Sequence, residues 1–452
     1  MAALVPVLVA GLAVFGGYTY GPAIKQTATV LGVSRTVNNT PVEHGGDLVY
    51  IGDTIHCEDI HHHEPSGLLF TACEDETETR KAWFPPLGTF EDPVKASKST
   101  GSIHIIDPKA RQDMTTKRLK FENFDSTFIT HGIDVISDPE KAGAVYVFAV
   151  NHVPHADYLA TKAGGQGDQK VLDKAQSRIE IFHHILGSST IRHVRSVQHP
   201  LVKTPNDIFI KDPHSFYVTN DHFYREGTMR LIEDLWSGAS WTDTIHVTID
   251  KLSALKPTDG VTAQVAYEGM RNNNGLGHYK PGYILIDDCS GAAMHIGKLS
   301  SDSKNVTIDI EDSVHFDSFI DNPSYFNDPY KSETQDTSGF ILPGLIRPID
   351  IVKQIGDPTS NIGSIVWYAK PIANCDSAKA DCWEKRALFE DDGTRIRSAA
   401  GAVLVAIDPA KENNKKKAWL FVTGFYSSAV VAVKVDLQRL SFDGQTSKKF
   451  FK

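Results

Sequence analysis

The stretch "PNDIFIKDPHSFYVTNDHF", residues 205–223, consists of two short runs of β-branched and aromatic residues with a turn between them. The first run is "IFIKD" (208–212) and the second is "SFYVTND" (215–221), and Pro213 and His214 separate them. Proline interrupts extended pairing, and Asn and Asp favour turns, so this pattern predicts two β-strands joined by a tight connection.

Runs of the same kind recur from about Leu68 onward, and Gly, Pro, Asn or Asp punctuate them. The main helical candidate, "VLDKAQSRI" (171–179), is short and merges into a strand. Short strands without long helical segments between them predict an all-β protein. The further runs are "LLFTAC" (68–73), "SIHIID" (102–107), "AVYVFAV" (144–150), "RIEIF" (178–182), "IHVTID" (245–250), "AQVAY" (263–267), "YILIDD" (283–288), "MHIGKL" (294–299), "NVTIDI" (305–310), "SIVWYA" (364–369), "AVLVAI" (402–407), "AWLFVTG" (418–424) and "AVVAVKV" (429–435).

The number of runs narrows the architecture. Sandwich, barrel and propeller all agree with the pattern itself, but about two dozen strands exceed one simple sandwich, and a propeller holds that number without long exposed edges. No WD or kelch signature occurs in the sequence. Two longer polar stretches, 321–339 and 376–393, are expected to be loops on the propeller faces. The predicted propeller spans 45–437, and the polar tail 438–452 follows it.

The segment from Ala2 to Ile24 carries no charged side chain, which predicts a signal peptide or membrane anchor over residues 1–24. The basic region of a cleaved signal is missing, and Tyr18 and Tyr20 suit a membrane interface, so an uncleaved anchor is favoured. The net charge of -10 argues against nucleic acid as a partner. We expect a protein of the secretory pathway, extracellular or anchored with a lumenal or extracellular propeller.

The cysteines fit that compartment. Cys375 and Cys382 can close a small loop, and Cys57 and Cys73 flank an expected hairpin, which leaves Cys289 free. The sequons at residues 38–40 and 305–307 would allow glycosylation.

No serine-hydrolase elbow, H-E-x-x-H, paired C-x-x-C or Walker loop occurs in the chain. The sequence offers instead oxygen donors at strand ends. Each Asn-Asp pair taken singly is typical of a turn, but propeller loops converge at a central channel, where distant carboxylates and amides can surround one calcium ion. The donors are Glu58, Asp59, Asn206, Asp207, Asn220, Asp221, Asn274, Asp321 and Asn322.

Several of these donors lie in motifs that occur together in one family. "CEDI" (57–60), "HGID" (131–134), "VYVFAVNH" (145–152), "IEIF" (179–182), the stretch 205–223, "NNNGLG" (272–277) and the Asp-Asn pair at 321–322 occur in the family's order. In these motifs the chain resembles the paraoxonase/arylesterase family of calcium-dependent lactonases and esterases, over roughly Asp53 to Leu437, as a divergent member with enlarged loops. The most specific piece is "PNDI" followed by "FYVTNDH".

The resemblance implies a six-bladed β-propeller with two calcium ions in its central tunnel. It places Glu58, Asn206, Asn274, Asp321 and Asn322 on a catalytic calcium. It places Asp59, Asp207 and the backbone oxygen of Ile133 on a deeper structural calcium. His131 and His152 form a dyad above the catalytic ion.

The implied chemistry is hydrolysis of lactones and aryl esters, with organophosphate hydrolysis as a side activity. Calcium polarises the substrate oxygen, His131 takes a proton from water, and His152 orients it; Asp321 is the rival base. Two alternatives stay open: a non-catalytic calcium-stabilised binding module, and a strictosidine synthase-like or gluconolactonase-like propeller enzyme.

The stretch "TIHCEDIHHHEPSG" (54–67) holds four histidines beside the two acids, and a surface strand or turn is the favoured interpretation for these histidines. The chain also departs from the family. The family's disulfide between the region before the first blade and the C-terminus is absent, because no cysteine follows Cys382. Closure must then depend on strand pairing, which we expect between "AVVAVKV" (429–435) and "DLVYIG" (47–52).

Overall fold

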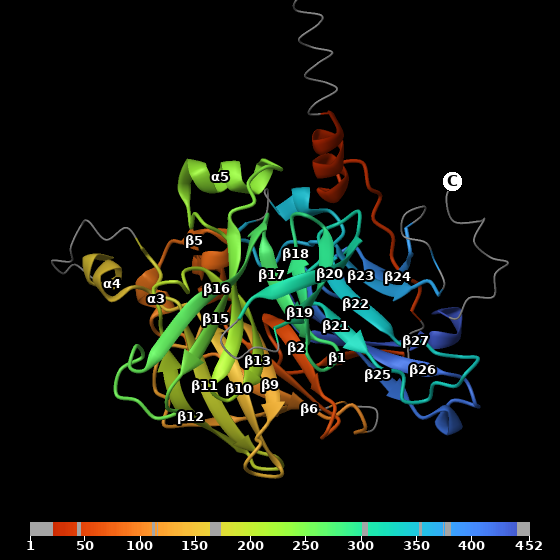
Figure 1. Cartoon of the computed structure of the whole chain (residues 1–452), viewed down its shortest axis with the longest axis horizontal. Helices are drawn as coiled ribbons and strands as arrows, with labels where there is room; N and C mark the ends of the chain where they lie inside the picture. Colours follow the sequence, from red (N-terminus) through yellow and green to blue (C-terminus); the bar gives the residue numbers. More distant parts are fainter. Residues whose placement is uncertain are drawn as a thin grey trace, which may run out of the picture.

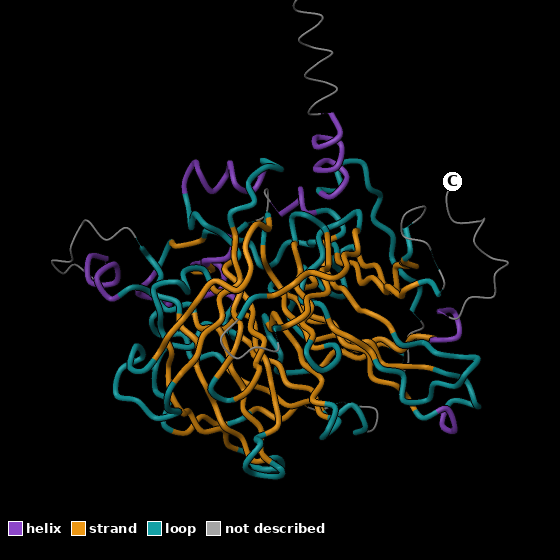
Figure 2. Tube along the Cα trace, viewed as in Figure 1, coloured by secondary structure: helices purple, strands orange, loops and turns teal. Residues whose placement is uncertain are grey.

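The computed structural model describes residues 21–42, 47–110, 114, 116–162, 173–300, 306–351, 355–373, 375 and 381–440. Its strands form six sheets of four or five strands each, together with one two-stranded ribbon (Figure 1). The sheets follow one another in chain order around a central tunnel, so the protein is a six-bladed β-propeller, as the sequence predicts. Figure 2 shows that strands make up the body and that the few helices lie at its periphery.

Each blade is antiparallel apart from one added parallel strand in the second. The first blade contains β2 (Cys57–His63), β3 (Leu68–Cys73), β6 (Ser102–Ile106) and β7 (Thr116–Arg118). The second contains β9 (Thr130–Ser137), β10 (Ala144–Asn151), β11 (Arg178–Ile185), β12 (Thr190–Val197) and β8 (Lys120–Glu122). The third contains β13 (Pro205–Asp212), β14 (Ser215–Asn220), β15 (Thr242–Ile249) and β16 (Val261–Met270).

The remaining blades complete the ring. The fourth contains β17 (Asn273–His278), β18 (Tyr283–Asp288), β19 (Ala293–Leu299) and β20 (Ile308–His315). The fifth contains β21 (Ser324–Phe326), β22 (Gly339–Leu345), β23 (Ser364–Pro371) and β24 (Trp383–Asp391). The sixth contains β25 (Ala399–Ile407), β26 (Lys417–Gly424), β27 (Val430–Asp436) and β1 (Leu48–Ile51).

Closure of the ring rests on the strand pairing expected from the sequence. β1, from the N-terminal side of the chain, pairs antiparallel with β27, with Leu48 opposite Val433 and Ile51 opposite Val430. Ile51 is fully buried in a cluster that also holds Val430 and Ala432. The first and last strands of the propeller therefore share one hydrophobic core, which joins the two ends of the ring.

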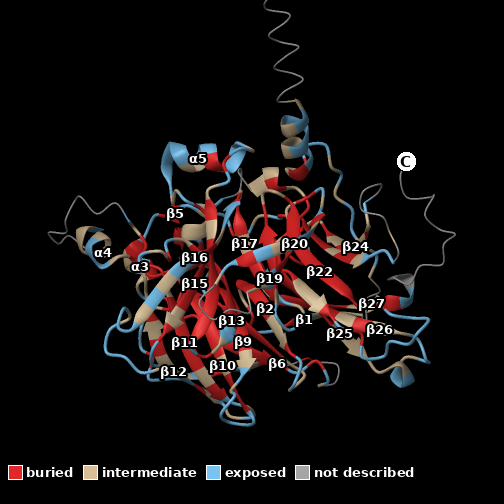
Figure 3. Cartoon of the chain, in the orientation of Figure 1, coloured by how far each residue is buried: buried red, intermediate tan, exposed pale blue. Residues whose placement is uncertain are grey.

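The inner strands β2, β9, β13, β17, β21 and β25 contact one another in a closed ring around the tunnel. Two glycines allow the closest approaches. A Cβ at Gly132 would lie 2.4 Å from the carbonyl oxygen of Asn206, and a Cβ at Gly275 would lie 2.4 Å from Cα of Asn322. Hydrophobic clusters fill the space between neighbouring blades, and Figure 3 shows that the strands in the middle of the molecule are largely buried. The site lies on this rigid ring.

Helices occur only in connections or near the N-terminus, among the described residues. Residues 21–30 are helical, and so are α2 (Thr77–Ala82), α3 (Pro93–Ala96), α4 (Ala156–Lys162) and α5 (Gly227–Leu235). Short 3-10 turns are η1 (Pro85–Leu87), η2 (Pro348–Asp350), η3 (Pro409–Lys411) and η4 (Leu437–Leu440), and the ribbon is β4 (Trp83–Phe84) with β5 (Thr89–Phe90). None of the helices described here is long and apolar enough to cross a membrane. Most of the anchor predicted over 1–24, and the tail beyond residue 440, lie outside the described residues.

Two local expectations were wrong, and a third was wrong for part of its stretch. Residues 173–177 of the helical candidate are not helical, because the segment leads directly into β11, which pairs with β10. The stretch 376–393 contains β24, whose pairing with β23 completes the fifth blade. The stretch 321–339 is a loop over 327–338, as expected, but it also contains β21, the short inner strand of that blade. Tertiary pairing recruits polar segments that carry no strand signal of their own.

The two disulfides occur as expected, Cys57–Cys73 across β2 and β3 and Cys375–Cys382 in a surface loop. Cys289 is buried and has no disulfide partner. The first disulfide immediately precedes Glu58 and Asp59, so it fixes the start of the strand that carries both acids into the tunnel.

Candidate functional site

The upper cluster consists of Glu58, Asn206, Asn274, Asp321 and Asn322, which the fold brings together from four inner strands or their starts. Four of its side-chain oxygens are buried and accept no hydrogen bond from the described residues. They are Glu58 Oε2 and the amide oxygens of Asn206, Asn274 and Asn322.

Two of the three amide nitrogens of the upper cluster donate hydrogen bonds within the protein. The Asn322 Nδ2 donates to Glu58 Oε1 at 2.9 Å, and the Asn274 Nδ2 donates to the Asn272 side chain at 3.2 Å. The amide oxygens of Asn274 and Asn322 are therefore left without a donor. Unsatisfied buried oxygens cost free energy unless a cation fills the space between them.

The pKa shifts of the two carboxylates also indicate that a cation would stabilise this cluster. Burial, together with Asp321 and Asp59, raises the pKa of Glu58 well above its usual range. Burial, with Asp59 and Asp221 nearby, raises the pKa of Asp321 in the same direction. Two carboxylates and three amide oxygens form an all-oxygen set with a charge of about -2, which suits Ca²⁺. The upper cluster therefore fits calcium.

The histidine dyad lies against this cluster. His131 on β9 and His152 after β10 are both buried, and His131 Nδ1 lies 3.1 Å from His152 Nε2. The other nitrogen of His131, Nε2, is 3.7 Å from Glu58 Oε1. His152 Nδ1 in turn hydrogen-bonds with the Ser177 hydroxyl at 2.9 Å. One chain of contacts thus runs from Ser177 through both imidazoles to the upper cluster.

Both imidazoles are neutral at neutral pH. Burial, with His152 and Arg80 nearby, lowers the pKa of His131 well below its usual value. Burial, against the opposing charge of Asp221, lowers the pKa of His152 to about 3. A neutral imidazole can accept a proton, which is the property a general base requires.

The ribbon β4–β5 holds the dyad in place. The Trp83 indole N–H donates to the carbonyl oxygen of His152 at 2.8 Å, and the Phe84 ring packs on His131 with centroids 5.4 Å apart. Neither residue was identified from the sequence, because nothing in "KAWFPP" signals a contact with strands far along the chain. Ser177 was missed for the same reason.

A cavity of ≈ 330 Å³ opens on the upper cluster and the dyad. His131, Asn206, Asn274 and Asp321 line it, so the rival base Asp321 faces the same space as His131. Its walls are mainly apolar and include Phe84, Leu231, Leu235, Phe319 and Phe425. Such a cavity suits a small, largely apolar molecule with one polar reacting group.

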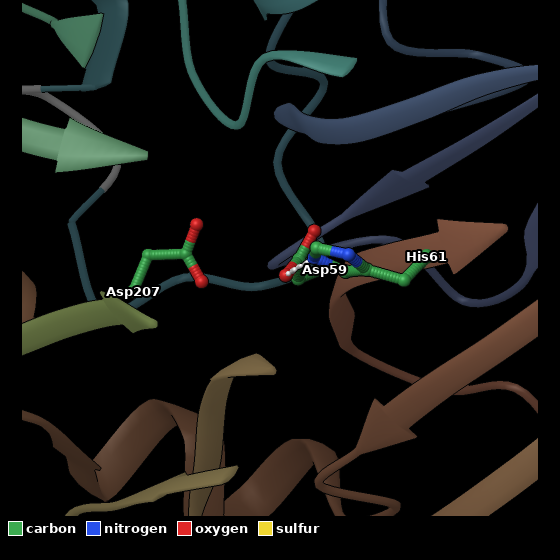
Figure 4. Close-up of side chains that lie close together, drawn as sticks. All are labelled: Asp59, His61 and Asp207. Atoms are coloured by element: carbon green, nitrogen blue, oxygen red, sulfur yellow. Dashed lines mark hydrogen bonds and ion pairs between the residues drawn. The ribbon is translucent and has the colours of Figure 1, made fainter. Parts of the chain in front are cut away.

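The lower residues Asp59, Asp207 and Ile133 also meet, but with a composition that differs from the expected one. The Ile133 N–H donates to Asp59 Oδ2 at 3.1 Å, and burial, with Asp59 nearby, raises the pKa of Asp207 well above its usual range. His61 enters this group: its Nε2 lies 3.0 Å from Asp59 Oδ2 (Figure 4). An imidazole does not belong to an all-oxygen calcium shell.

The interpretation of all four histidines in 54–67 as residues of a surface strand or turn is wrong for His56 and His63, which are buried, and for His61, which contacts Asp59. Although burial lowers the pKa of His61, the carboxylates of Asp59 and Asp134 outweigh it and raise this pKa to about 9. Asp134 comes from the next blade, so no local sequence signal could place it there. Asn220, by contrast, is a turn residue, because its side-chain oxygen accepts from the N–H groups of Lys203 and Thr204.

The fold and the site define a six-bladed propeller whose tunnel holds a buried set of oxygen ligands beside a pair of neutral histidines. The family model described as Arylesterase matches residues 170–324. The chain is 26% identical to mouse (Mus musculus) serum paraoxonase/arylesterase 1 over 200 residues, 44% of this chain and 46% of that protein. It is 23% identical to rabbit (Oryctolagus cuniculus) serum paraoxonase/lactonase 3 over 266 residues, 58% and 60% of the two chains. In these matches the chain is similar to the paraoxonase/arylesterase family over part of its length.

The similarity is partial, since the chain spans about half the length of the curated relatives that it matches. Among solved structures, a luciferin-regenerating enzyme superposes with a TM-score of 0.42 at 11% identity and covers 86% of this chain and 94% of its own. A putative gluconolactonase gives a TM-score of 0.38 at 10% identity, with 88% and 98% covered. These scores carry no argument about function.

Proposed function

We propose that this protein is a calcium-dependent hydrolase of lactones and aryl esters, with organophosphates as side substrates. The observation that supports the proposal most directly is that the upper cluster has four buried oxygens without a hydrogen-bond donor, and that two of its residues, Asn206 and Asn274, line the same largely apolar cavity as His131. The similarity to paraoxonases and arylesterases supports the same class of reaction.

In this proposal Glu58, Asn206, Asn274, Asp321 and Asn322 hold the calcium ion. When bound, calcium supplies Lewis-acid polarisation of a carbonyl or phosphoryl oxygen. The other contributions come from the chain itself, and they concern the water molecule, the orientation of the base and the binding of the substrate.

His131 is the proposed general base. Its pKa lies below its usual value because of burial, so the ring is neutral and free to take a proton from water at Nε2, which faces the upper cluster. Water then forms the new bond to the carbonyl carbon, the ester C–O bond breaks, and the proton passes to the leaving oxygen. His152 and Ser177 keep His131 in position through the 3.1 Å and 2.9 Å contacts.

The cavity walls would bind the substrate. Phe84, Phe319 and Phe425 offer aromatic surface, and Leu231 and Leu235 come from α5, which Figure 1 shows above the propeller on the same side as the N-terminal helix. Apolar walls favour the ring or acyl chain of a lactone or aryl ester over a charged substrate. The two disulfides support a location in the secretory pathway.

The experiment is an assay of aliphatic and aromatic lactones and aryl esters, first with calcium and then with excess EGTA. We expect hydrolysis only with calcium, and a higher melting temperature with calcium, because binding to the native state stabilises it. His131→Gln should lower turnover by about 10²-fold or more while calcium still raises the melting temperature. His62→Gln, on the same strand as Glu58 but outside the upper cluster, is a matched control that should keep wild-type turnover.

Two outcomes would contradict the proposal. If calcium raises the melting temperature but no lactone or aryl ester is hydrolysed, the protein is a calcium-stabilised binding module. If His131→Gln retains wild-type turnover, then Asp321, which lines the same cavity, becomes the base to test.

A further inference from the structure

The opposite end of the tunnel holds a second group of titratable side chains. A cavity of ≈ 590 Å³ is lined by Asp59, His61 and His278, together with later residues of the inner strands. Because the inner strands start at the upper cavity, this one lies at their far ends. We call Asp59, His61, Asp134, Asp207 and His278 the lower cluster.

His61 lies between two carboxylates. Its Nε2 is 3.0 Å from Asp59 Oδ2, and its Nδ1 is 3.3 Å from Asp134 Oδ1. Asp134 is fixed in turn by His278, whose Nε2 lies 2.8 Å from Asp134 Oδ2. The ring is therefore oriented, with one nitrogen toward Asp59 and the other toward Asp134.

Asp207 faces the same point from the third blade. Each of Asp59, His61 and Asp207 offers one possible metal-ligand atom, and these three atoms lie within 4.8 Å of one another. Figure 4 shows the Asp207 carboxylate directed at the Asp59–His61 pair. The donor atoms of a tetrahedral zinc ion lie roughly 3.4 Å apart, so the three side chains need only a small closure to share one ion.

The backbone fixes the carboxylates in advance. Asp207 accepts from the N–H of Ile208 and of Leu276, at 2.7 Å each. Asp59 accepts from the N–H of Ile60 at 2.7 Å and of Ile133 at 3.1 Å. Asp59 Oδ1 and both Asp207 oxygens accept one backbone bond each, which leaves each of them a second lone pair for a metal ion, whereas Asp59 Oδ2 also contacts His61 Nε2.

The types of ligand atom in the lower cluster distinguish between calcium and a transition metal. Calcium prefers oxygen ligands alone, whereas a set of one imidazole and two carboxylates suits a borderline transition metal. A metal-bound imidazole usually donates its other N–H to a carboxylate, and Asp134 stands in that position beside Nδ1. The two acids would also neutralise a divalent charge. The lower cluster therefore disagrees with the second calcium that the family resemblance implies.

We infer that the lower cluster binds one divalent transition metal of the zinc class through Asp59, His61 Nε2 and Asp207, with Asp134 as the hydrogen-bond acceptor that orients His61. Asp59 and His61 line the lower cavity, so water can reach the site from there. This site shares no ligand with the upper cluster.

The test is a titration of the full chain, stripped with chelator and returned to saturating calcium, with zinc and with cobalt. Calorimetry and elemental analysis should give one tightly bound zinc ion per chain. Cobalt should give visible absorption bands typical of mixed nitrogen and oxygen ligands. His61→Gln should weaken zinc binding by more than tenfold and abolish the cobalt bands, and Asp134→Asn should weaken binding about 10- to 100-fold.

His62→Gln is the matched control, because it removes the neighbouring histidine of the same strand and should leave zinc affinity unchanged. Zinc binding that survives in His61→Gln but fails in His62→Gln would mean an adventitious surface site and would overturn the inference. Absence of bound zinc, or its displacement by calcium, would overturn it as well. Neither result would touch the calcium-dependent hydrolysis at the upper cluster, which is assayed separately.

Discussion

The substitution Gly275→Ala tests whether the close contact of two inner strands positions a ligand of the upper cluster. The new Cβ would lie 2.4 Å from Cα of Asn322 and 2.7 Å from its Oδ1. Carbon atoms in ordinary contact are about 3.5 Å apart, so the segment carrying Asn322 must move by about 1 Å.

Two separable effects follow. The added methyl group should lower the free energy of unfolding by about 1–3 kcal/mol, the usual cost of overpacking a dense interior. The displaced Asn322 oxygen should also weaken calcium. At calcium a hundredfold above the wild-type Kd, binding stabilises the native state by about 2.7 kcal/mol, and much of this gain should disappear in Gly275→Ala.

The assay is urea unfolding of wild type and Gly275→Ala, each in saturating calcium and in EGTA. Gly52→Ala is the control, since a Cβ there meets nothing within 4 Å. We expect Gly275→Ala to differ from wild type in EGTA and to differ more in calcium. A variant that gains as much stability from calcium as the wild type would refute the placement of Asn322 in the upper cluster.

Three further predictions concern the dyad, the ring closure and the acid response. Ser177→Ala should lower kcat about tenfold with little change in KM, because His152 loses the hydrogen bond that orients it. Ser177→Thr should restore the rate. A change in KM alone would contradict this role. Ile51→Ala should lower the free energy of unfolding, measured in urea, by about 2–5 kcal/mol. Tyr50 lies on the same strand but is 52% exposed, so Tyr50→Ala should lower it far less. Equal losses in the two variants would argue against a buried closure of the ring. Burial lowers the pKa of His104 to about 4 from its usual 6.5. As the pH drops below 6.5, the unfolded chain therefore takes up a proton at this histidine before the folded chain does. The free energy of unfolding then falls by about 1.4 kcal/mol per pH unit from this group. His104→Gln should reduce that fall between pH 7.5 and pH 5.5, and an unchanged pH response would contradict it.

Much of the propeller could be predicted from local sequence. Runs such as "YILIDD" (283–288) are apolar enough to be buried strands on their own, and they form strands in the structure. The disulfides and the pairing of the first and last strands also followed from the sequence, the latter because no cysteine remained to close the ring. β24 could not be predicted, since its polar residues become a strand only through their pairing with β23.

The sequence by itself determined which residues could serve the site, because motifs such as "HGID" and "PNDI" carry their side chains at fixed positions along short strands. Only the tertiary structure decided what those side chains meet. His61 follows Asp59 by two residues and so shares its face of the strand, but its function depends on Asp134 and His278, which reach it from two other blades. Contacts across a closed ring depend on the order and tilt of all six blades, and no segment of the chain encodes that arrangement alone.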